Sequence, residues 1–280
     1  MIDKNQDIEV FNIFRLMTES NIPYVSWKNN HEIEDFMDKG SDLDLYIPIK
    51  YKSEFINIAK KSWWVLVFNP VAKFDSIEHF YTIDKGFNIY HLHVYFEIVT
   101  GESWTKEYRL PIGDFLMNNR CNHKEFGIDI LNDKCQAYLF ALRHILKCGS
   151  ITSRLLYLKE IDSYQSEWKL CNFNASNLKG YGPILLNEVI DNSGLLEGFS
   201  LSKYINSMVF RFKLRPYLRI NYFLLSVYRA KSFIVRLVNK LFLKRKKLLK
   251  NKGQIISISG VDGSGKSSMV DMLDLNFSRF

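Results

Sequence analysis

The stretch GSDLDLYI, residues 40–47, alternates polar and apolar side chains from Asp42 onward. Such alternation predicts a half-buried strand, and Gly40 marks the turn that opens it. Because residues two apart on a strand face the same way, Asp42 and Asp44 are expected side by side. The leucines that follow each of them would anchor the opposite face of the strand.

Two adjacent carboxylates repel each other and are stabilised most by a divalent cation between them, and Mg²⁺ prefers such oxygen ligands. Nucleotidyl transfer by metal ions needs this arrangement, because the cations align the attacking oxygen and stabilise the departing pyrophosphate. We therefore predict that Asp42 and Asp44 are catalytic metal ligands. The alternative is an exposed strand edge or an Asx turn at Ser41 and Asp42.

Around this strand, residues 1–120 alternate helix-like and strand-like patterns, which predicts an α/β (α+β) domain with a small mixed sheet. Helices are expected over residues 7–20 and 51–62, and strands over residues 22–28, 63–69, 78–83 and 87–99. The last two strands would be joined by a turn at the Asp-Lys-Gly of residues 84–86.

The expected strand over residues 87–99 places His91, His93, Tyr95 and Glu97 on one face. Histidine acts near neutral pH as a metal ligand or as a proton carrier, so His91 and His93 are predicted catalytic residues. Glu97 would supply a third carboxylate. The alternative is a pair of histidines that are hydrogen-bonded within a half-buried sheet.

Composition bounds the class of protein. Of the 280 residues 47% are hydrophobic, which excludes global disorder. The four cysteines lack zinc-ligand spacing, which indicates thiols of a reducing compartment; they are Cys121, Cys135, Cys148 and Cys171. The polar N-terminus does not read as a signal peptide, and no apolar run approaches the ~20 residues that a membrane span needs. We expect a cytoplasmic protein.

The net charge of +8 comes from one segment. No acidic residue lies between Glu197 and Asp262, and residues 203–252 hold 15 Lys or Arg, which leaves 23 basic and 30 acidic residues elsewhere. This asymmetry predicts contact with a polyanion: an anionic membrane at its inner face, a charged glycan or, less favoured, nucleic acid. The alternative is a basic helix that packs on an acidic partner domain.

From residue 132 the pattern becomes mainly helical, with helices expected over residues 132–148 and 153–168. The basic stretch 203–252 is also expected to be helical, with an interruption at Pro216. Its end, residues 244–253, is expected to be an exposed linker. The short strand QIISIS of residues 254–259 and a helix from Lys266 complete the chain.

Between these last two elements lies a phosphate-binding pattern, G-x-x-x-x-G-K-[ST], filled by residues 260–267. Glycines let backbone N–H groups surround phosphate oxygens, Lys266 can reach the β- and γ-phosphates, and the Ser267 hydroxyl can bind Mg²⁺. The ligand would be ATP or another nucleoside triphosphate. The predicted nucleotide-binding residues are Gly260, Asp262, Gly263, Ser264, Gly265, Lys266 and Ser267.

The sequence GVDGSGKSS resembles the loop of thymidylate kinase-like P-loop kinases, G-x-D-G-x-G-K-S. That family has a further acidic strand, an acceptor-nucleotide site and a lid, so residues 253–280 correspond to its first βα unit alone. We expect no kinase turnover from this chain.

Residues 20–115 resemble the nucleotidyltransferase-like domain that precedes such kinase domains in a family of bacterial two-part proteins. The matching motifs are Trp27-Lys28-Asn29-Asn30, Gly40 to Leu45, His91-Leu92-His93, and Gly101-Glu102 with Lys106, Tyr108, Leu110 and Pro111. The resemblance implies four parts: a nucleotidyltransferase-like domain at 1–120, a helical domain at 121–202, a basic helical linker at 203–252 and an incomplete kinase-like unit at 253–280. Active polymerase-type nucleotidyltransferases usually carry a Gly-Ser turn that binds phosphate before the acidic strand, and here residues 27–29 take its place.

These observations give a leading hypothesis, an Mg²⁺-dependent nucleotidyl- or phosphoryl-transferase that acts on an unidentified small-molecule or glycan-related acceptor. Lys28, Ser41 and Lys106 would contact phosphate. The second hypothesis is a catalytically silent nucleotide-binding adaptor, which docks on anionic membrane or on a partner through its basic helices.

Overall fold

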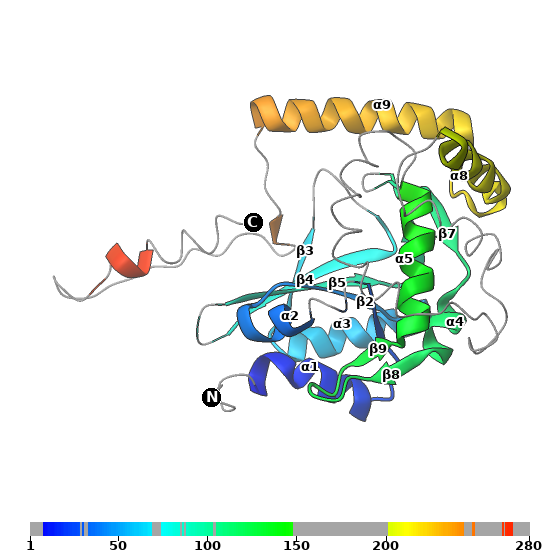
Figure 1. Ribbon diagram of the computed structural model, residues 1–280. Helices are drawn as coiled ribbons and strands as arrows, with labels where there is room; N and C mark the ends of the chain where they lie inside the picture. Colours follow the sequence, from blue (N-terminus) through cyan, green and yellow to red (C-terminus); the bar gives the residue numbers. More distant parts are fainter. Residues whose placement is uncertain are drawn as a thin grey trace.

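The computed structural model of the chain is shown in Figure 1. It describes residues 8–28, 30, 33–68, 74–84, 86, 88–102, 105–147, 201–243, 248–249, 265 and 267–270. The expected helix at 153–168 and the expected strand at 254–259 lie outside these residues.

The centre of the molecule is a mixed eight-stranded sheet in the order β10-β3-β4-β5-β2-β1-β9-β8. Its strands are β1 (Val25–Lys28), β2 (Asp42–Tyr46), β3 (Val65–Phe68), β4 (Ile77–Ile83), β5 (Ile89–Tyr95), β8 (Arg120–Asn122), β9 (Asp129–Leu131) and the two-residue β10 (Leu248–Leu249). The neighbours β2 and β5 run parallel, while β1 and β4, outside them, are antiparallel to this pair. The predicted mixed α/β architecture is therefore confirmed.

Gly40 opens β2 as the sequence predicts. Its φ of +66° lies in the left-handed region, which glycine adopts without a steric penalty. A Cβ at this position would also clash with the carbonyl oxygen of Ile89. The start of the central strand therefore requires glycine for two independent reasons.

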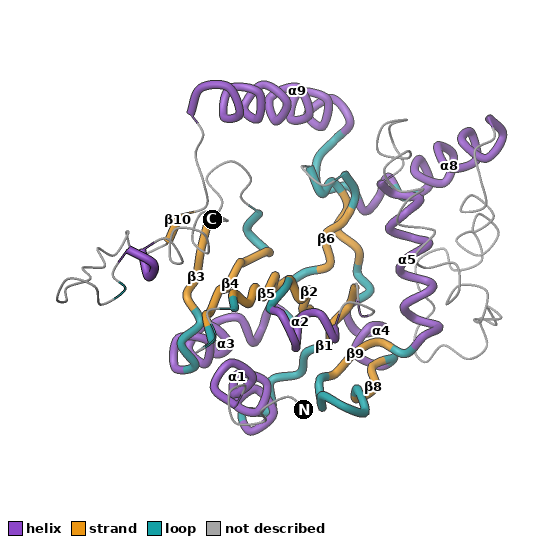
Figure 2. Tube along the Cα trace, turned by 60° about the vertical axis from the view of Figure 1, so that its left-hand side comes forward, coloured by secondary structure: helices purple, strands orange, loops and turns teal. Residues whose placement is uncertain are grey.

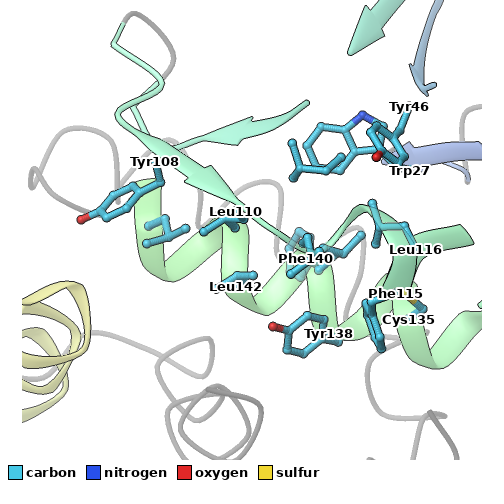
Figure 3. Close-up of a cluster of buried hydrophobic side chains, with 14 of the residues drawn as sticks. Trp27, Tyr46, Tyr108, Leu110, Phe115, Leu116, Cys135, Tyr138, Phe140 and Leu142 are labelled. Carbon is cyan, nitrogen blue, oxygen red and sulfur yellow. The ribbon is translucent and has the colours of Figure 1, made fainter. Parts of the chain in front are cut away.

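Each face of the sheet is covered by its own hydrophobic core. On one face α1 (Ile8–Glu19), α2 (Ile33–Lys39) and α3 (Lys52–Lys61) pack on Leu43, Leu45 and Leu92. On the other face α4 (Gly113–Asn118) and α5 (Asp133–Lys147) pack on an aromatic cluster that includes Trp27 and Tyr46. Figure 2 shows α1 and α5 on different sides of the sheet, and Figure 3 shows the second cluster. The leucines of β2 thus anchor it as expected, and its acidic residues belong to the other face.

Two local features differ from the sequence prediction. The expected strand over 87–99 ends at Tyr95, and after a bend at residues 96–97 the chain enters β6 (Ile98–Thr100), which pairs with β7 (Tyr108–Leu110) in a separate two-stranded sheet. The main sheet also continues past residue 120, because β9 pairs in parallel with β1. Strands of three residues are too short for alternation to reveal them.

The basic segment is helical, with the predicted interruption at Pro216. It consists of α8 (Leu201–Lys213), the 3₁₀ turn η5 (Arg215–Tyr217), α9 (Tyr222–Val238) and the π-helical turn η6 (Asn239–Leu243). Asn221 caps α9, since its side-chain oxygen accepts a hydrogen bond from the Leu224 N–H at 2.9 Å. The linker expected at 244–253 is partly wrong, because β10 pairs antiparallel with β3.

A buried glutamate joins this helical segment to the sheet. Glu107 is fully buried and lies 3.2 Å from the Arg211 guanidinium on α8 and 3.3 Å from the Arg229 guanidinium on α9. Its carboxylate also accepts hydrogen bonds from the Thr105 hydroxyl and from the Glu102 N–H. A buried carboxylate with four donors is fully compensated, so Glu107 fixes the last turn of α8 and the first half of α9 relative to β7.

Within the described residues, no helix has both the length and the apolar character that crossing a membrane requires.

Candidate functional site

The predicted acidic pair lies on β2, beside the histidines of β5. The parallel register pairs Asp42 with His91 and Asp44 with His93. Nδ1 of His91 is 2.7 Å from a carboxylate oxygen of Asp42, and Nδ1 of His93 is 2.9 Å from one of Asp44. The four residues therefore share one face of the sheet, as the period of a strand predicts.

Lys28 reaches the same face through a bulge in β1. The register between β1 and β2 shifts between Ser26 and Lys28, so consecutive residues no longer alternate strictly. As a result Trp27 packs edge-on against Tyr95, with ring centroids 5.0 Å apart, while Lys28 Nζ lies 2.6 Å from the Asp44 carboxylate. The Lys28 and Asp44 side chains are only 10% and 9% exposed.

The hydroxyl of Tyr95 is the point at which two lysines converge. Lys28 Nζ donates to it at 2.7 Å and Lys106 Nζ at 3.2 Å. Lys106 comes from the loop before β7, where it adopts a φ of +40° in the left-handed region, an uncommon conformation for a residue with a side chain. Lys106 therefore lies beside Lys28, and its predicted contact with phosphate stays a prediction.

Burial governs the charges of this cluster. Burial alone would raise the pKa of Asp44. The charge of Lys28 and the nearby His93 have a larger, opposite effect, so the pKa of Asp44 lies well below its ordinary value. Burial also lowers the pKa of Lys28, against the attraction of Asp44. Burial lowers the pKa of Lys106 to about 8 and that of His93 to about 4. At neutral pH His93 is therefore uncharged and Lys106 remains mostly protonated.

Cations outnumber anions here. The buried Arg143 of α5 lies over the ring of Trp27 and disfavours the charged forms of both Lys28 and Lys106. Within the described part of the chain, the carboxylate that acts on both lysines is Asp44. Because a buried excess of positive charge is costly, this cluster has a physical preference for an added anion.

A layer of rings lies beside the cluster and was not predicted. His79 and Tyr81 of β4 pair with His93 and His91, and their rings stack at centroid distances of 4.4 Å and 4.2 Å. Nδ1 of His79 is also 2.9 Å from Nε2 of His91. The alternation in IEHFYTI, residues 77–83, carried this information, because it places both rings on one face.

Other predicted residues lie elsewhere. Glu97 follows the end of β5 and pairs with Arg109 at 3.2 Å, in a separate cavity of about 1080 Å³, so it does not add a third carboxylate to Asp42 and Asp44. Glu102 pairs with Arg229 at 3.0 Å. The Ser41 hydroxyl is buried and has no hydrogen-bond partner within the described residues, so its predicted phosphate contact stays a prediction.

Part of the phosphate-binding loop is described. Gly265 has a φ of +81°, and residues 267–270 form a helical turn in which the Met269 N–H donates to the Gly265 carbonyl oxygen. This agrees with a helix that begins after the loop. The remaining predicted residues lie outside the described part of the chain; they are Gly260, Asp262, Gly263, Ser264 and Lys266.

The predicted metal site does not have the expected form. No group of three or more His, Cys, Asp or Glu within the described residues is arranged to hold a metal ion. Asp44 instead has the Lys28 ammonium as its counter-ion, while the Asp42 carboxylate lies 2.7 Å from His91 Nδ1 and its side chain is 75% exposed. A divalent cation shared by Asp42 and Asp44 would have to displace Lys28. Mg²⁺ binding therefore stays a prediction of the sequence.

Comparison with family models, with curated proteins and with solved structures gave no match.

Proposed function

We propose that this chain binds the phosphates of a nucleotide at the lysines that meet on Tyr95, and that it is a transferase of the nucleotidyl- or phosphoryl-transfer class. The observation that supports this most directly is the convergence of Lys28 and Lys106 on one buried hydroxyl, with Arg143 nearby and Asp44 as their shared carboxylate.

A phosphate group suits this cluster better than a carboxylate or a neutral ligand. Lysine acts as a compact charge that attracts phosphate without a fixed geometry, and two converging lysines offset more than one negative charge. The phosphate would also raise the pKa values of both lysines back toward their ordinary range, which recovers part of the cost of their burial. Asp44 and Tyr95 would hold the lysines in place before the ligand arrives.

The transfer reaction depends on the residues next to this cluster. Asp42 is exposed, and its partner His91 is hydrogen-bonded to His79, so a carboxylate and linked imidazoles lie beside the proposed phosphate site. These groups can orient an acceptor hydroxyl and accept its proton. Mg²⁺, when bound with the nucleotide, would stabilise the charge of the phosphates, and Asp42, whose side chain is 75% exposed, would be its ligand.

We call the site formed by Lys28, Lys106 and Tyr95 the front site. Nucleotide binding by the chain with Lys266→Met tests the proposal, since this substitution removes the lysine of the P-loop-like pattern and leaves the front site as the phosphate site that is measured. ATP titration by calorimetry should detect binding that weakens about 10- to 100-fold on Lys28→Met or Lys106→Met, the effect of one charged hydrogen bond. Lys60→Met, on the exposed side of α3, is the matched control and should leave binding unchanged. Equal affinity in all variants would reject the front site.

A second candidate function is a nucleotide-binding adaptor without turnover. It is favoured by the ion pair between Lys28 and Asp44, because metal-dependent transfer uses two carboxylates and Asp44 already has an ammonium partner. The two candidates differ in their response to Asp42→Asn. Release of pyrophosphate or nucleoside diphosphate that requires Mg²⁺ and is lost in this variant supports the enzyme. Nucleotide binding without any release supports the adaptor.

A further inference from the structure

We propose that α9 and the π-helical turn η6 lie flat in the interfacial layer of an anionic lipid bilayer, with their exposed apolar face among the acyl chains. This inference concerns an interaction surface and does not depend on the proposed transferase activity.

The distribution of polar and apolar side chains on α9 and η6 is the reverse of that on an ordinary surface helix. Its less exposed stripe is polar and recurs at spacings of three and four: Arg229, Ser232, Arg236 and Asn239. The exposed positions are instead largely apolar: Phe223, Leu224, Val227, Tyr228, Phe233, Ile234, Val235, Leu237, Val238, Leu241, Phe242 and Leu243. A surface helix normally places its apolar stripe toward the core. An exposed apolar face of this length marks a surface that another phase or molecule covers.

The first turns of α9 fix the helix on the domain. Leu225 is buried, and the Arg229 guanidinium lies 3.0 Å from the Glu102 carboxylate and 3.3 Å from that of Glu107. Beyond this anchor the apolar side chains stay exposed, and Phe242 is 77% exposed. Both views place α9 at the opposite end of the molecule from α1 (Figures 1 and 2). A planar surface can therefore approach α9 without meeting α1.

The positive charge of this segment indicates that an anionic membrane covers the apolar face. Residues 222–252 contain ten Lys or Arg and no Asp or Glu. Lys231 and Lys240 are exposed on the helix itself, and six of the ten follow it between residues 244 and 252. Long cationic side chains can keep their charge at the headgroups while their stems lie along the apolar surface. A large apolar face with flanking Lys and Arg is the pattern of helices that lie in a membrane interface.

The geometry suits a helix in the plane of the membrane. Twenty-two residues, 222–243, form α9 and η6, with a length of about 33 Å. Four cationic residues occur within these helical turns, which disfavours burial across the hydrocarbon layer. β10 then pairs with β3, so the chain returns to the domain after η6.

Vesicle flotation with the full chain tests this proposal. The probes are phosphatidylcholine vesicles and vesicles with roughly one third phosphatidylserine. We expect binding to the anionic vesicles that exceeds binding to neutral ones by about fivefold for each basic residue that reaches the surface. This preference should fall steeply as salt rises from about 0.05 to 0.5 M.

The variant Ile234→Glu/Phe242→Glu adds two acidic groups to the apolar face and should reduce anionic-vesicle binding at least about tenfold. Trp63→Glu, at a site that is 83% exposed in the turn between α3 and β3, is the matched control and should bind as the parent does. Lys231→Ser/Lys240→Ser should reduce the preference for anionic over neutral vesicles. Circular dichroism identifies any variant that has lost its helical structure, and the Lys231/Lys240 pair, which leaves the apolar face intact, then carries the test.

Absence of anionic-vesicle binding by the parent chain would overturn the proposal, as would undiminished binding by the folded glutamate pair. Light scattering without lipid gives a third outcome. A stable dimer that the glutamate pair dissociates would assign this face to a second copy of the chain and reject the membrane.

Discussion

The ion pair between Lys28 and Asp44 gives the sharpest prediction. Lys28→Met keeps most of the apolar stem but leaves the Asp44 carboxylate, 9% exposed, without its ammonium partner at 2.6 Å. Removal of one partner from a buried pair costs about 3–5 kcal/mol, because the other charge stays buried without compensation. The Tyr95 hydroxyl also loses a donor at 2.7 Å, which adds about 1 kcal/mol. Nδ1 of His93 still lies 2.9 Å from the Asp44 carboxylate and offsets part of this sum, so we expect the free energy of unfolding to fall by about 3–5 kcal/mol.

Urea denaturation monitored by tryptophan fluorescence measures this loss, and Lys60→Met controls for removal of an exposed lysine. The double variant Lys28→Met/Asp44→Asn should be more stable than the sum of the two single effects predicts, by about 1–3 kcal/mol, because it leaves no unpaired charge. A loss below about 1 kcal/mol for Lys28→Met, or strictly additive effects, would refute the assignment of a buried pair.

Three further predictions concern the residues that hold the site in place. Glu107→Ala leaves Arg211 and Arg229 without their buried acceptor and should lower the free energy of unfolding by about 3–5 kcal/mol, whereas Glu102→Ala should lower it by at most about 1 kcal/mol. Equal losses in urea denaturation would contradict the role of Glu107 in holding α8 and α9. The pKa of Lys106 is lowered to about 8, so between this value and its ordinary value of about 10.4 the unfolded chain binds the additional proton. Stability should therefore rise with pH across that window, and urea midpoints of Lys106→Met should lack that part of the rise. Gly40→Ala combines an unfavourable φ with a clash, whereas Gly127→Ala, at a φ of +67° with open space around it, has the φ cost alone. Thermal denaturation should show a larger loss for Gly40→Ala, and equal losses would contradict the close approach of Gly40 to Ile89.

Much of the sheet could be predicted from the sequence. The alternation around Asp42 and Asp44 correctly predicted β2, its buried leucines and the common face of the two aspartates. The interruption of the basic helices at Pro216 was also correct, because proline acts locally on the backbone. These features depend on the alternation of side chains along a strand and on local steric effects, which a short stretch of sequence determines.

The partners within the site could not be predicted in the same way. Whether Asp44 meets a metal or an ammonium depends on the bulge at Lys28, which no alternation in β1 reveals. Arg143 reaches the cluster from α5 and lies over the ring of Trp27, which is 116 residues earlier in the sequence. Glu107 is a buried carboxylate whose neighbours in the sequence are Lys106 and Tyr108. Long-range packing decides these contacts, and composition carries no signal for them.

An ATP titration shows whether Lys28 and Lys106 form a phosphate site. ATP is titrated into the chain with Lys266→Met, and into the same chain with Lys28→Met, Lys106→Met or Lys60→Met added. We predict binding that Lys28→Met or Lys106→Met weakens about 10- to 100-fold and that Lys60→Met does not change. Binding that is absent in the Lys266→Met chain, or that persists at full strength without Lys28 and Lys106, would contradict it.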